Sequence, residues 1–309
     1  MTKLISAVPN ISEGRDVAFI EGVRKQLEEV PGLVLMDVAR DQARNRTIFS
    51  FMGAKEAVFQ GGFVLYENAI KHIDMRRHEG AYPRIGAVDI FPFVAIRPSS
   101  LEEAIRWANE FGYEVGNRFS VPVYLAGNAA KYPMRRELES IREGEYEGFA
   151  AKMRDAAWRP DFGPDDFPAD RGATMISARL PLINLKLYLT SNNEEAAKWT
   201  AKVLSGLSNG FPDVRLYPGV DHKLNSAFIN VTVRNYTATP LYRVFEAIRT
   251  ELRRFGTNIK SAEAVGLVPQ SALVDSALHY LHISDFTEDH VLETRMEHIF
   301  HQGMANITQ

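Results

Sequence analysis

The sequence contains no cysteine, and this absence excludes several kinds of site. Its 309 residues offer no thiol that could form a disulfide, act as a nucleophile or bind zinc. No apolar run approaches the ~20 residues that a membrane-spanning helix needs. The first ten residues, MTKLISAVPN, have too short an apolar run for a signal peptide. These absences are compatible with a cytoplasmic protein, which is what we expect.

The charges nearly balance, with 36 basic and 39 acidic residues and a formal net charge of −3. This balance leaves no electrostatic footprint for nucleic acid or an anionic membrane. The eight histidines are scattered. His279 and His282 could meet on one helix face, but they have no clear acidic partner. There is no GxxxxGK[ST] phosphate loop and no dinucleotide fingerprint. We therefore expect no nucleic-acid partner, no membrane partner and no metal.

Two successive patterns of alternating strands and helices, called the first and second pass, follow one another along the chain. In the first, strand and helix periodicities alternate in the order βαββαβ, in residues 3–8, 17–30, 33–38, 47–52, 55–73 and 88–96. The second repeats this order without visible sequence similarity, in residues 183–189, 196–204, 214–217, 227–233, 241–255 and 258–263. The order predicts an α+β protein, an α/β sandwich of two ferredoxin-like subdomains with both helices on one face.

Other segments lie outside these passes. Ser100 and Glu103 have a capping-box pattern that opens a helix, and Ser191 and Glu194 repeat it before the first helix of the second pass. The remaining predictions are a strand at 121–125, one charged amphipathic helix at 135–155, and two short helices at 270–281 and 288–300.

Residues 158–173 contain three Pro, two Gly and four Asp. No regular helix or internal strand tolerates this spacing of proline. The stretch is therefore either a linker between domains or a rigid loop that lines a cleft between them. Both interpretations place a domain boundary nearby, and we assign residues 1–178 and 179–309 to two subdomains.

The residues from Asp74 to Ile90 are the most promising stretch for chemistry. They place three Arg, one His, three acids, one Tyr and two Gly between an apolar helix and an apolar strand. Arginine forks bind carboxylates in a bidentate way, so Arg76, Arg77 and Arg84, with Asn45 and Arg46, suit a small anionic substrate. An ordinary solvated loop with surface charge is the alternative, and composition alone leaves it open.

Eight short motifs together make a family resemblance specific. They are VPNISEG (8–14), NRT (45–47), DMRRH (74–78), PRIGAVD (83–89), VPVYL (121–125), IREGEYE (141–147), DFGP (161–164) and VGLVP (265–269). They resemble the formiminotransferases, which are glutamate formimidoyltransferases, over about residues 3–285. The sequence carries no helical cyclodeaminase domain, so it resembles the monofunctional form.

The resemblance implies a fold, a reaction and a set of site residues. The fold would be two α/β subdomains in a V around a folate cleft, in a homodimer. The reaction would move a formimino group from N-formimino-L-glutamate to N5 of tetrahydrofolate, a co-substrate, in histidine degradation. The implied folate loop is Gly163, Pro164, Asp165, Asp166, Phe167, Pro168, Ala169, Asp170, Arg171 and Gly172. The implied substrate residues are Asn10, Asn45, Arg46, Arg84 and Gly86.

One departure from the family pattern concerns catalysis. The family's catalytic histidine stands in Gly-(Glu or Ala)-His-Pro-Arg, whereas this sequence has Tyr82 at that place. A family acidic residue falls on Ala39. Histidine, with an ordinary pKa of ~6.5, both takes and gives protons near neutrality, whereas tyrosine near ~10 mainly donates.

Three hypotheses follow from this departure. In the first, the chain is a working transferase in which Tyr82 or His78 handles the proton. In the second, it is a folate-binding paralogue with little or no transfer activity. In the third, it is a transferase that uses another amidine or one-carbon donor.

Overall fold

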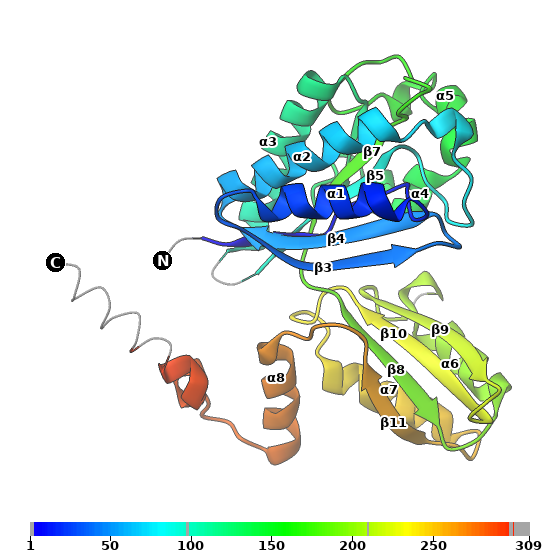
Figure 1. Cartoon of the computed structure of the whole chain (residues 1–309). Helices are drawn as coiled ribbons and strands as arrows, with labels where there is room; N and C mark the ends of the chain where they lie inside the picture. The colour runs from blue at the N-terminus through cyan, green and yellow to red at the C-terminus, as the bar shows by residue number, and fades with distance from the viewer. Residues whose placement is uncertain (1–2, 97–98, 209, 297–298, 300–309) are drawn as a thin grey trace. The chain divides into compact units, whose positions relative to one another are not determined.

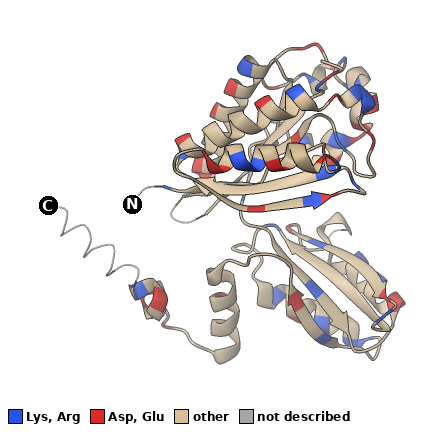
Figure 2. Ribbon diagram, in the orientation of Figure 1, with Lys and Arg blue, Asp and Glu red and all other residues tan. Residues whose placement is uncertain are grey.

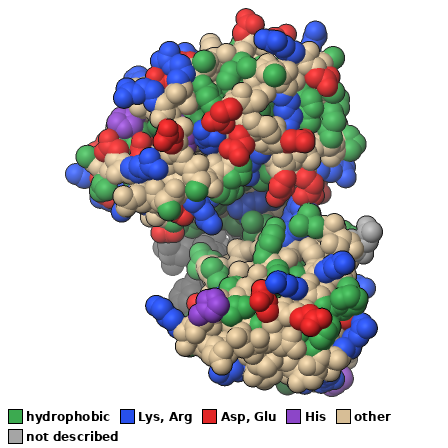
Figure 3. Space-filling view, turned by 90° about the vertical axis from the view of Figure 1, so that its right-hand side faces the viewer, with side chains coloured by type: hydrophobic (Ala, Val, Ile, Leu, Met, Phe, Trp, Pro, Cys, Tyr) green, Lys and Arg blue, Asp and Glu red, His purple; other side chains and the backbone are tan. Residues whose placement is uncertain are grey.

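The computed structural model describes every residue except 1–2, 97–98, 209, 297–298 and 300–309. The chain forms two compact units, Met1–Pro181 and Leu182–Gln309 (Figure 1). Each unit combines helices with one β-sheet, which confirms the α+β class. Among the described helices, none is long and apolar enough to cross a membrane. Lys and Arg are interspersed with Asp and Glu on the ribbon and on the face that the space-filling view shows (Figures 2 and 3).

The first unit is built on a mixed, seven-stranded sheet. Its strands are β1 (Ile5–Ala7), β2 (Asn10–Ile11), β3 (Leu33–Asp41), β4 (Arg46–Gly53), β5 (Val88–Ala95), β6 (Val123–Gly127) and β7 (Thr174–Arg179). β1 and β2 both lie between β4 and β5 and are antiparallel to each. β3 pairs with β4 at one edge, and β5, β7 and β6 run parallel toward the other. β6 and β7 extend the predicted βαββαβ order.

Three long helices cover one face of this sheet: α1 (Val17–Glu28), α2 (Lys55–His72) and α3 (Leu101–Phe119) (Figure 1). Asp16 caps α1 by accepting a hydrogen bond from the Phe19 N–H. The predicted capping box of Ser100 and Glu103 is present at the start of α3. A buried aromatic cluster fills the space beneath the helices, because alternate β5 side chains such as Phe91 point to this face.

The other face of the β5–β7–β6 region is covered by two short helices, α4 (Leu138–Arg142) and α5 (Glu145–Lys152). The prediction of one helix over 135–155 was therefore wrong. Gly144 stands between the two helices with φ +84°, a left-handed backbone that ends a right-handed helix. The break turns Glu145 and Glu147 toward the loop that precedes β5.

The second unit has a four-stranded antiparallel sheet in the order β11-β8-β10-β9. Its elements are β8 (Ile183–Leu189), α6 (Glu194–Leu204), β9 (Val214–Asp221), β10 (Ser226–Val233), α7 (Leu241–Arg253), β11 (Ile259–Ala264) and α8 (Gln270–Leu281). The predicted βαββαβ order is present. The apolar stripe of α7 is buried against the sheet, through Leu241, Val244, Ile248 and Leu252.

Of two predictions for this unit, the capping box at Ser191 is wrong and the helix at 288–300 lies partly outside the described residues. The α6 N-cap is Asn193, which accepts a hydrogen bond from the Ala196 N–H, so the Ser191 capping box was wrong. Ser191 instead donates to the Thr257 hydroxyl at 2.8 Å. A 3₁₀ helix spans Glu288–His290, and residues 297–298 and 300 of the predicted helix 288–300 lie outside the described residues.

Candidate active site

The segment between α2 and β5 forms a short turn and then an ordered loop. The 3₁₀ helix η1 (Met75–Arg77) is capped by Asp74, whose carboxylate accepts a hydrogen bond from the Arg76 N–H. The loop then passes very close to the β3–β4 turn. A Cβ on Gly80 would lie 2.4 Å from the Arg44 carbonyl oxygen. Only glycine fits this approach, which brings the loop beside the start of β4.

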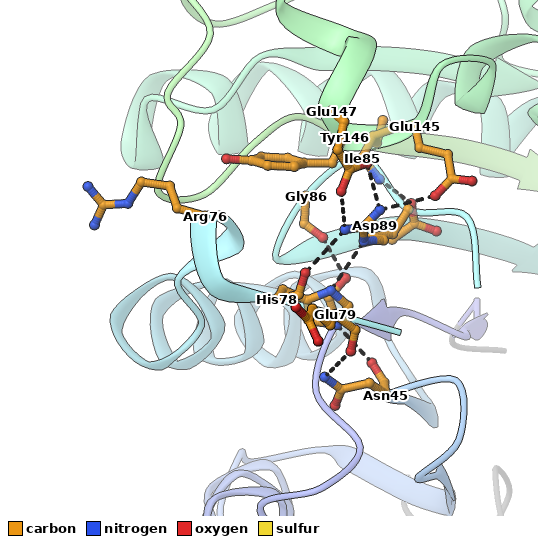
Figure 4. A network of polar contacts seen from close by, with 12 residues as sticks. Asn45, Arg76, His78, Glu79, Ile85, Gly86, Asp89, Glu145, Tyr146 and Glu147 are labelled. Atoms are coloured by element: carbon orange, nitrogen blue, oxygen red, sulfur yellow. Dashed lines mark hydrogen bonds and ion pairs between the residues drawn. The ribbon is translucent and has the colours of Figure 1, made fainter. Parts of the chain in front are cut away.

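Asn45 joins the motif at residues 8–14 to the loop between α2 and β5. Its Oδ1 accepts a hydrogen bond from the Gly14 N–H at 2.9 Å, and its Nδ2 donates to the Glu79 carbonyl at 2.9 Å (Figure 4). Asn45 is buried and has φ +49°, a backbone region in which asparagine is tolerated better than most residues. Both polar ends of its side chain are thus occupied by the protein.

His78 is also held at both ring nitrogens (Figure 4). Its Nδ1 accepts from Arg84 Nε at 3.2 Å, and its Nε2 lies 3.1 Å from the Asn45 carbonyl oxygen. A guanidinium only donates, so Nδ1 is unprotonated and Nε2 carries the proton. Burial lowers the pKa of His78, which favours the neutral imidazole. Protonation of Nδ1 would place two cations in contact.

Arg84 is buried and bound to two carboxylates. Its Nη2 is 2.6 Å from Glu147 Oε1, and its Nη1 is 3.1 Å from Glu145 Oε2. Burial alone would lower the pKa of Arg84, but the hydrogen bond and charge of Glu147 outweigh it and raise the pKa. The Arg84 hydrogen bond in turn lowers the pKa of Glu147. This network borders an open cleft of about 570 Å³, lined by His78, Glu79, Gly80, Arg84, Gly144, Glu145 and Glu147.

Tyr82 is half-buried beneath guanidinium groups. The guanidinium carbons of Arg46 and Arg142 lie 4.2 Å and 5.2 Å from its ring centroid, within the range of cation–π attraction. Arg142 donates from Nη2 to Asp89 Oδ2, and Asp89 Oδ1 accepts from the Ile85 N–H at 3.0 Å. The Tyr82 hydroxyl makes no hydrogen bond to any residue that the structure describes.

Three buried polar atoms in this region lack a hydrogen-bond partner among the described residues. They are Asn10 Oδ1, Arg46 Nε and Arg142 Nε. Arg46 also has no carboxylate within ion-pairing distance in the described part of the chain. Burial lowers the pKa of Arg46, and the neighbouring Arg142 charge lowers it further, while Tyr82 and Asp89 oppose this. Unpaired buried donors and acceptors are costly in a folded protein, so each calls for an explanation, such as a catalytic role or a bound water or ion.

The loop 163–172 is fastened at both ends by glycines with positive φ. A Cβ on Gly163 would lie 2.2 Å from the Val121 carbonyl, and one on Gly172 would lie 2.3 Å from the Ile85 carbonyl. Between them, the Asp170 carbonyl accepts from the Met75 N–H at 2.8 Å. The residues of the loop are half-buried or exposed, except Gly172, which is buried. The loop therefore runs beside the segment from Asp74 to Ile90, which contains Tyr82 and is called the Tyr82 segment below.

Gly86 belongs to this same backbone contact. It forms an isolated antiparallel bridge with Gly172, and a Cβ there would lie 2.1 Å from the Ala173 carbonyl. The Ser12 hydroxyl donates to its carbonyl at 2.8 Å. Its close packing against the chain accounts for glycine at this position. The ligand-binding role assigned to Gly86 from sequence stays a prediction.

Comparison with known proteins decides the family. The N-terminal subdomain of the formiminotransferase domain matches residues 4–179, and the formiminotransferase domain itself matches residues 220–306. The chain belongs to the formiminotransferase family. It is 32% identical to a glutamate formimidoyltransferase of Streptococcus pyogenes serotype M1, over 93% of this chain and 96% of that protein. It is 34% identical to one of Thermoplasma acidophilum, over 95% of this chain and 97% of that protein.

A bifunctional relative is similar over part of its length. The formimidoyltransferase-cyclodeaminase of Rattus norvegicus is 36% identical over 91% of this chain, which matches 53% of the rat protein. The resemblance to the formiminotransferases seen in the sequence is confirmed by these matches. Within this formiminotransferase, no group of three or more His, Asp or Glu of the described residues is arranged to hold a metal ion.

The sequence-based prediction did not include three residues of this candidate site. Arg142, Glu145 and Glu147 all lie in the motif at 141–147, which supported the resemblance but supplied no site residue. Their spacing carried a signal, because Gly144 interrupts a charged helix pattern. Only the fold places Arg142 over Tyr82 and the two glutamates on Arg84. Ala39, which the resemblance puts at the place of a family acidic residue, pairs with Ile48 at the sheet edge.

Proposed function

We propose that this chain transfers the formimino group of N-formimino-L-glutamate to N5 of tetrahydrofolate. The observation that carries the proposal is the joining of separate family motifs into one hydrogen-bonded site. Gly14, Asn45, His78 and Arg84 are connected directly, and Tyr82 lies on the same loop. Relatives named glutamate formimidoyltransferase match this chain over nearly their full length.

In the proposed reaction, one carbon–nitrogen bond forms and another breaks. N5 of tetrahydrofolate attacks the amidine carbon and gives a tetrahedral intermediate, which collapses by expelling the amino nitrogen of glutamate. One proton leaves N5 and one reaches the departing nitrogen, so the proton count balances. A side chain that donates to that nitrogen and later recovers the proton supplies general acid catalysis.

The geometry favours Tyr82 over His78 as the proton donor. The Tyr82 hydroxyl is free of hydrogen bonds to described residues, whereas both nitrogens of His78 are engaged. A relay through His78 would first have to break its contact with Arg84 or with Asn45. We therefore assign proton donation to Tyr82 and the orientation of the loop to His78.

The loop 163–172 is the proposed folate-binding segment. Its glycine-fixed ends and its contact with the Tyr82 segment would place a bound pterin near the reacting amidine. We further propose that the two units are ferredoxin-like subdomains. Homodimer formation, a cytoplasmic location and a metal-free reaction are part of the same proposal.

The first test is a transfer assay with N-formimino-L-glutamate and tetrahydrofolate, comparing wild type with Tyr82→Phe and Tyr82→His. Phenylalanine keeps the ring beneath Arg46 but removes the hydroxyl. Tyr82→Phe should lower kcat by on the order of 10²–10⁴ while tetrahydrofolate binding is retained. His78→Asn is the comparison that reports on the alternative relay.

Other outcomes would identify a different function. An unchanged rate in Tyr82→Phe with a collapse in His78→Asn would transfer the proton role to His78. Wild type that binds tetrahydrofolate without turnover, and gains rate in Tyr82→His, would be a folate-binding paralogue. If neither wild type nor Tyr82→His transfers the formimino group of this donor, a different amidine or one-carbon donor becomes the better assignment.

A further inference from the structure

We propose that Arg46 and Arg142 together bind the α-carboxylate of the formimino donor, and that Asn10 accepts a hydrogen bond from its amidine N–H. The inference rests on the proposed function and names the residues that select its donor. Arg142 has no role in the sequence-based assignment. In the structure, Arg84 is bound to two glutamates, whereas Arg46 and Arg142 lie against the Tyr82 ring.

The available guanidinium groups are those stacked on Tyr82. Arg84 already binds Glu145 and Glu147, and Asn45 has both ends of its side chain occupied. Arg46, by contrast, has no carboxylate partner among the described residues, and its Nε is buried without a hydrogen bond. A carboxylate is the group that satisfies such a fork most completely.

Arg142 adds a second donor on the same aromatic ring. Its bond to Asp89 fixes one end of the guanidinium, and Asp89 is itself fixed by the Ile85 N–H. The Nε of Arg142 stays unpaired and buried. Both guanidinium carbons lie within about 5 Å of the Tyr82 ring centroid, at 4.2 Å and 5.2 Å. Arg46 and Arg142 carry two positive charges, and Asp89 neutralises one of them. One positive charge is left for a ligand.

Asn10 supplies the complementary acceptor. It pairs with Ile48 across β2 and β4, and Arg46 stands two residues before Ile48 on the same face of β4. Arg46 is therefore the diagonal neighbour of Asn10, a separation of about 7–8 Å between Cα atoms. Asn10 Oδ1 is buried and unpaired. An acceptor beside the Arg46 guanidinium matches an amidine N–H beside a carboxylate.

The chemistry of the two substrates favours the α-carboxylate of the donor. In N-formimino-L-glutamate the carbon that bears this carboxylate also bears the amidine nitrogen, so both must lie close to the proton donor. The γ-carboxylate is two methylene groups farther away. The glutamate tail of folate is separated from N5 by the whole p-aminobenzoyl group. An anion held against the Tyr82 ring is therefore best matched by the donor's α-carboxylate.

The test measures equilibrium binding of three probes to the full chain: N-formimino-L-glutamate, its α-carboxamide N-formimino-L-isoglutamine, and its γ-carboxamide N-formimino-L-glutamine. Wild type should bind the α-carboxamide about 10- to 100-fold more weakly than the donor, as expected for the loss of hydrogen bonds to a charged group. Arg46→Gln should bind the donor more weakly by a similar factor and no longer discriminate against the α-carboxamide. Its affinity for tetrahydrofolate should be unchanged.

Two further variants separate binding from folding. Arg24→Gln removes a partly exposed arginine from α1, where it pairs with Glu21 and Glu28, and is the matched control with unchanged donor affinity. Arg142→Lys keeps the charge opposite Asp89, so the protein should fold, but lysine cannot reproduce the fork. It should weaken donor binding and leave tetrahydrofolate binding intact.

The possible failures are distinguishable. If wild type binds and transfers the donor and Arg46→Gln does so equally well, this inference is wrong and the proposed function stands. The same follows if Arg46→Gln loses affinity for tetrahydrofolate alone, or if wild type discriminates only against the γ-carboxamide. If wild type does not bind N-formimino-L-glutamate at all, the proposed function fails and the inference fails with it.

Discussion

Gly172→Ala should destabilise the first unit strongly, although it adds a single methyl group. Gly172 has φ +70°, and a Cβ there would lie 2.3 Å from the Ile85 carbonyl and 2.7 Å from Gly86 Cα. The left-handed conformation costs a non-glycine residue roughly 1–2 kcal/mol. Overpacking typically costs about 1–3 kcal/mol, and here the obstacle is backbone that cannot rotate away. The expected loss in free energy of unfolding is about 2–5 kcal/mol.

Urea unfolding can report on this unit alone. The chain has three tryptophans, of which Trp107 and Trp158 lie in the first unit and Trp199 in the second. In a Trp199→Phe background, tryptophan fluorescence follows only the first unit. The urea midpoint of Gly172→Ala should fall by roughly 1–2 M at an unchanged slope.

Gly148→Ala is the matched control. Gly148 lies within α5, and a Cβ there would meet nothing within 4 Å. Alanine should therefore stabilise the helix by about 0.5–1 kcal/mol. If Gly172→Ala unfolds at the wild-type midpoint while Gly148→Ala behaves as expected, the contact between residues 172 and 85 is not rigid. The explanation of how the loop 163–172, the proposed folate-binding segment, is positioned would then be refuted.

Three other predictions follow from single contacts. Because burial lowers the pKa of His78 in the folded state, its contribution to stability is present above the unfolded pKa of ~6.5 and is lost as pH falls through the folded value. Urea midpoints from pH 8 to 5 should decline more in wild type than in His78→Asn. Arg135→Met should lower the free energy of unfolding in urea by about 3–5 kcal/mol, because it removes the buried partner of the Asp161 carboxylate and leaves only the exposed Lys131 ammonium, 3.8 Å away; Arg135→Met with Asp161→Asn should recover part of this. Asn193→Ala should cost about 1 kcal/mol of thermal or urea stability in the second unit, and no loss would contradict its assignment as the α6 N-cap.

The helices and strands were predictable where local patterns dominate. The capping box at Ser100 and the Asp16 cap depend on residues three apart, so the sequence contains the whole interaction. The stripe of α7 likewise shows in its spacing, because a period near 3.6 residues leaves one face to bury. The helix predicted over 135–155 failed for a local reason too, since the left-handed Gly144 outweighed the amphipathic pattern around it.

For the candidate site, too, local sequence features were predictable and long-range contacts were not. The sequence by itself determined the family motifs, and through them it predicted that Tyr82 stands where the family has a histidine, because both are statements about residue identity. Which arginine is neutralised and which remains available depends on contacts between residues far apart in the chain. Arg84 meets Glu147 across 63 residues, and Arg142 meets Asp89 across 53. Only the tertiary structure, by folding α4 and α5 over the Tyr82 loop, left Arg46 without a carboxylate partner among the described residues.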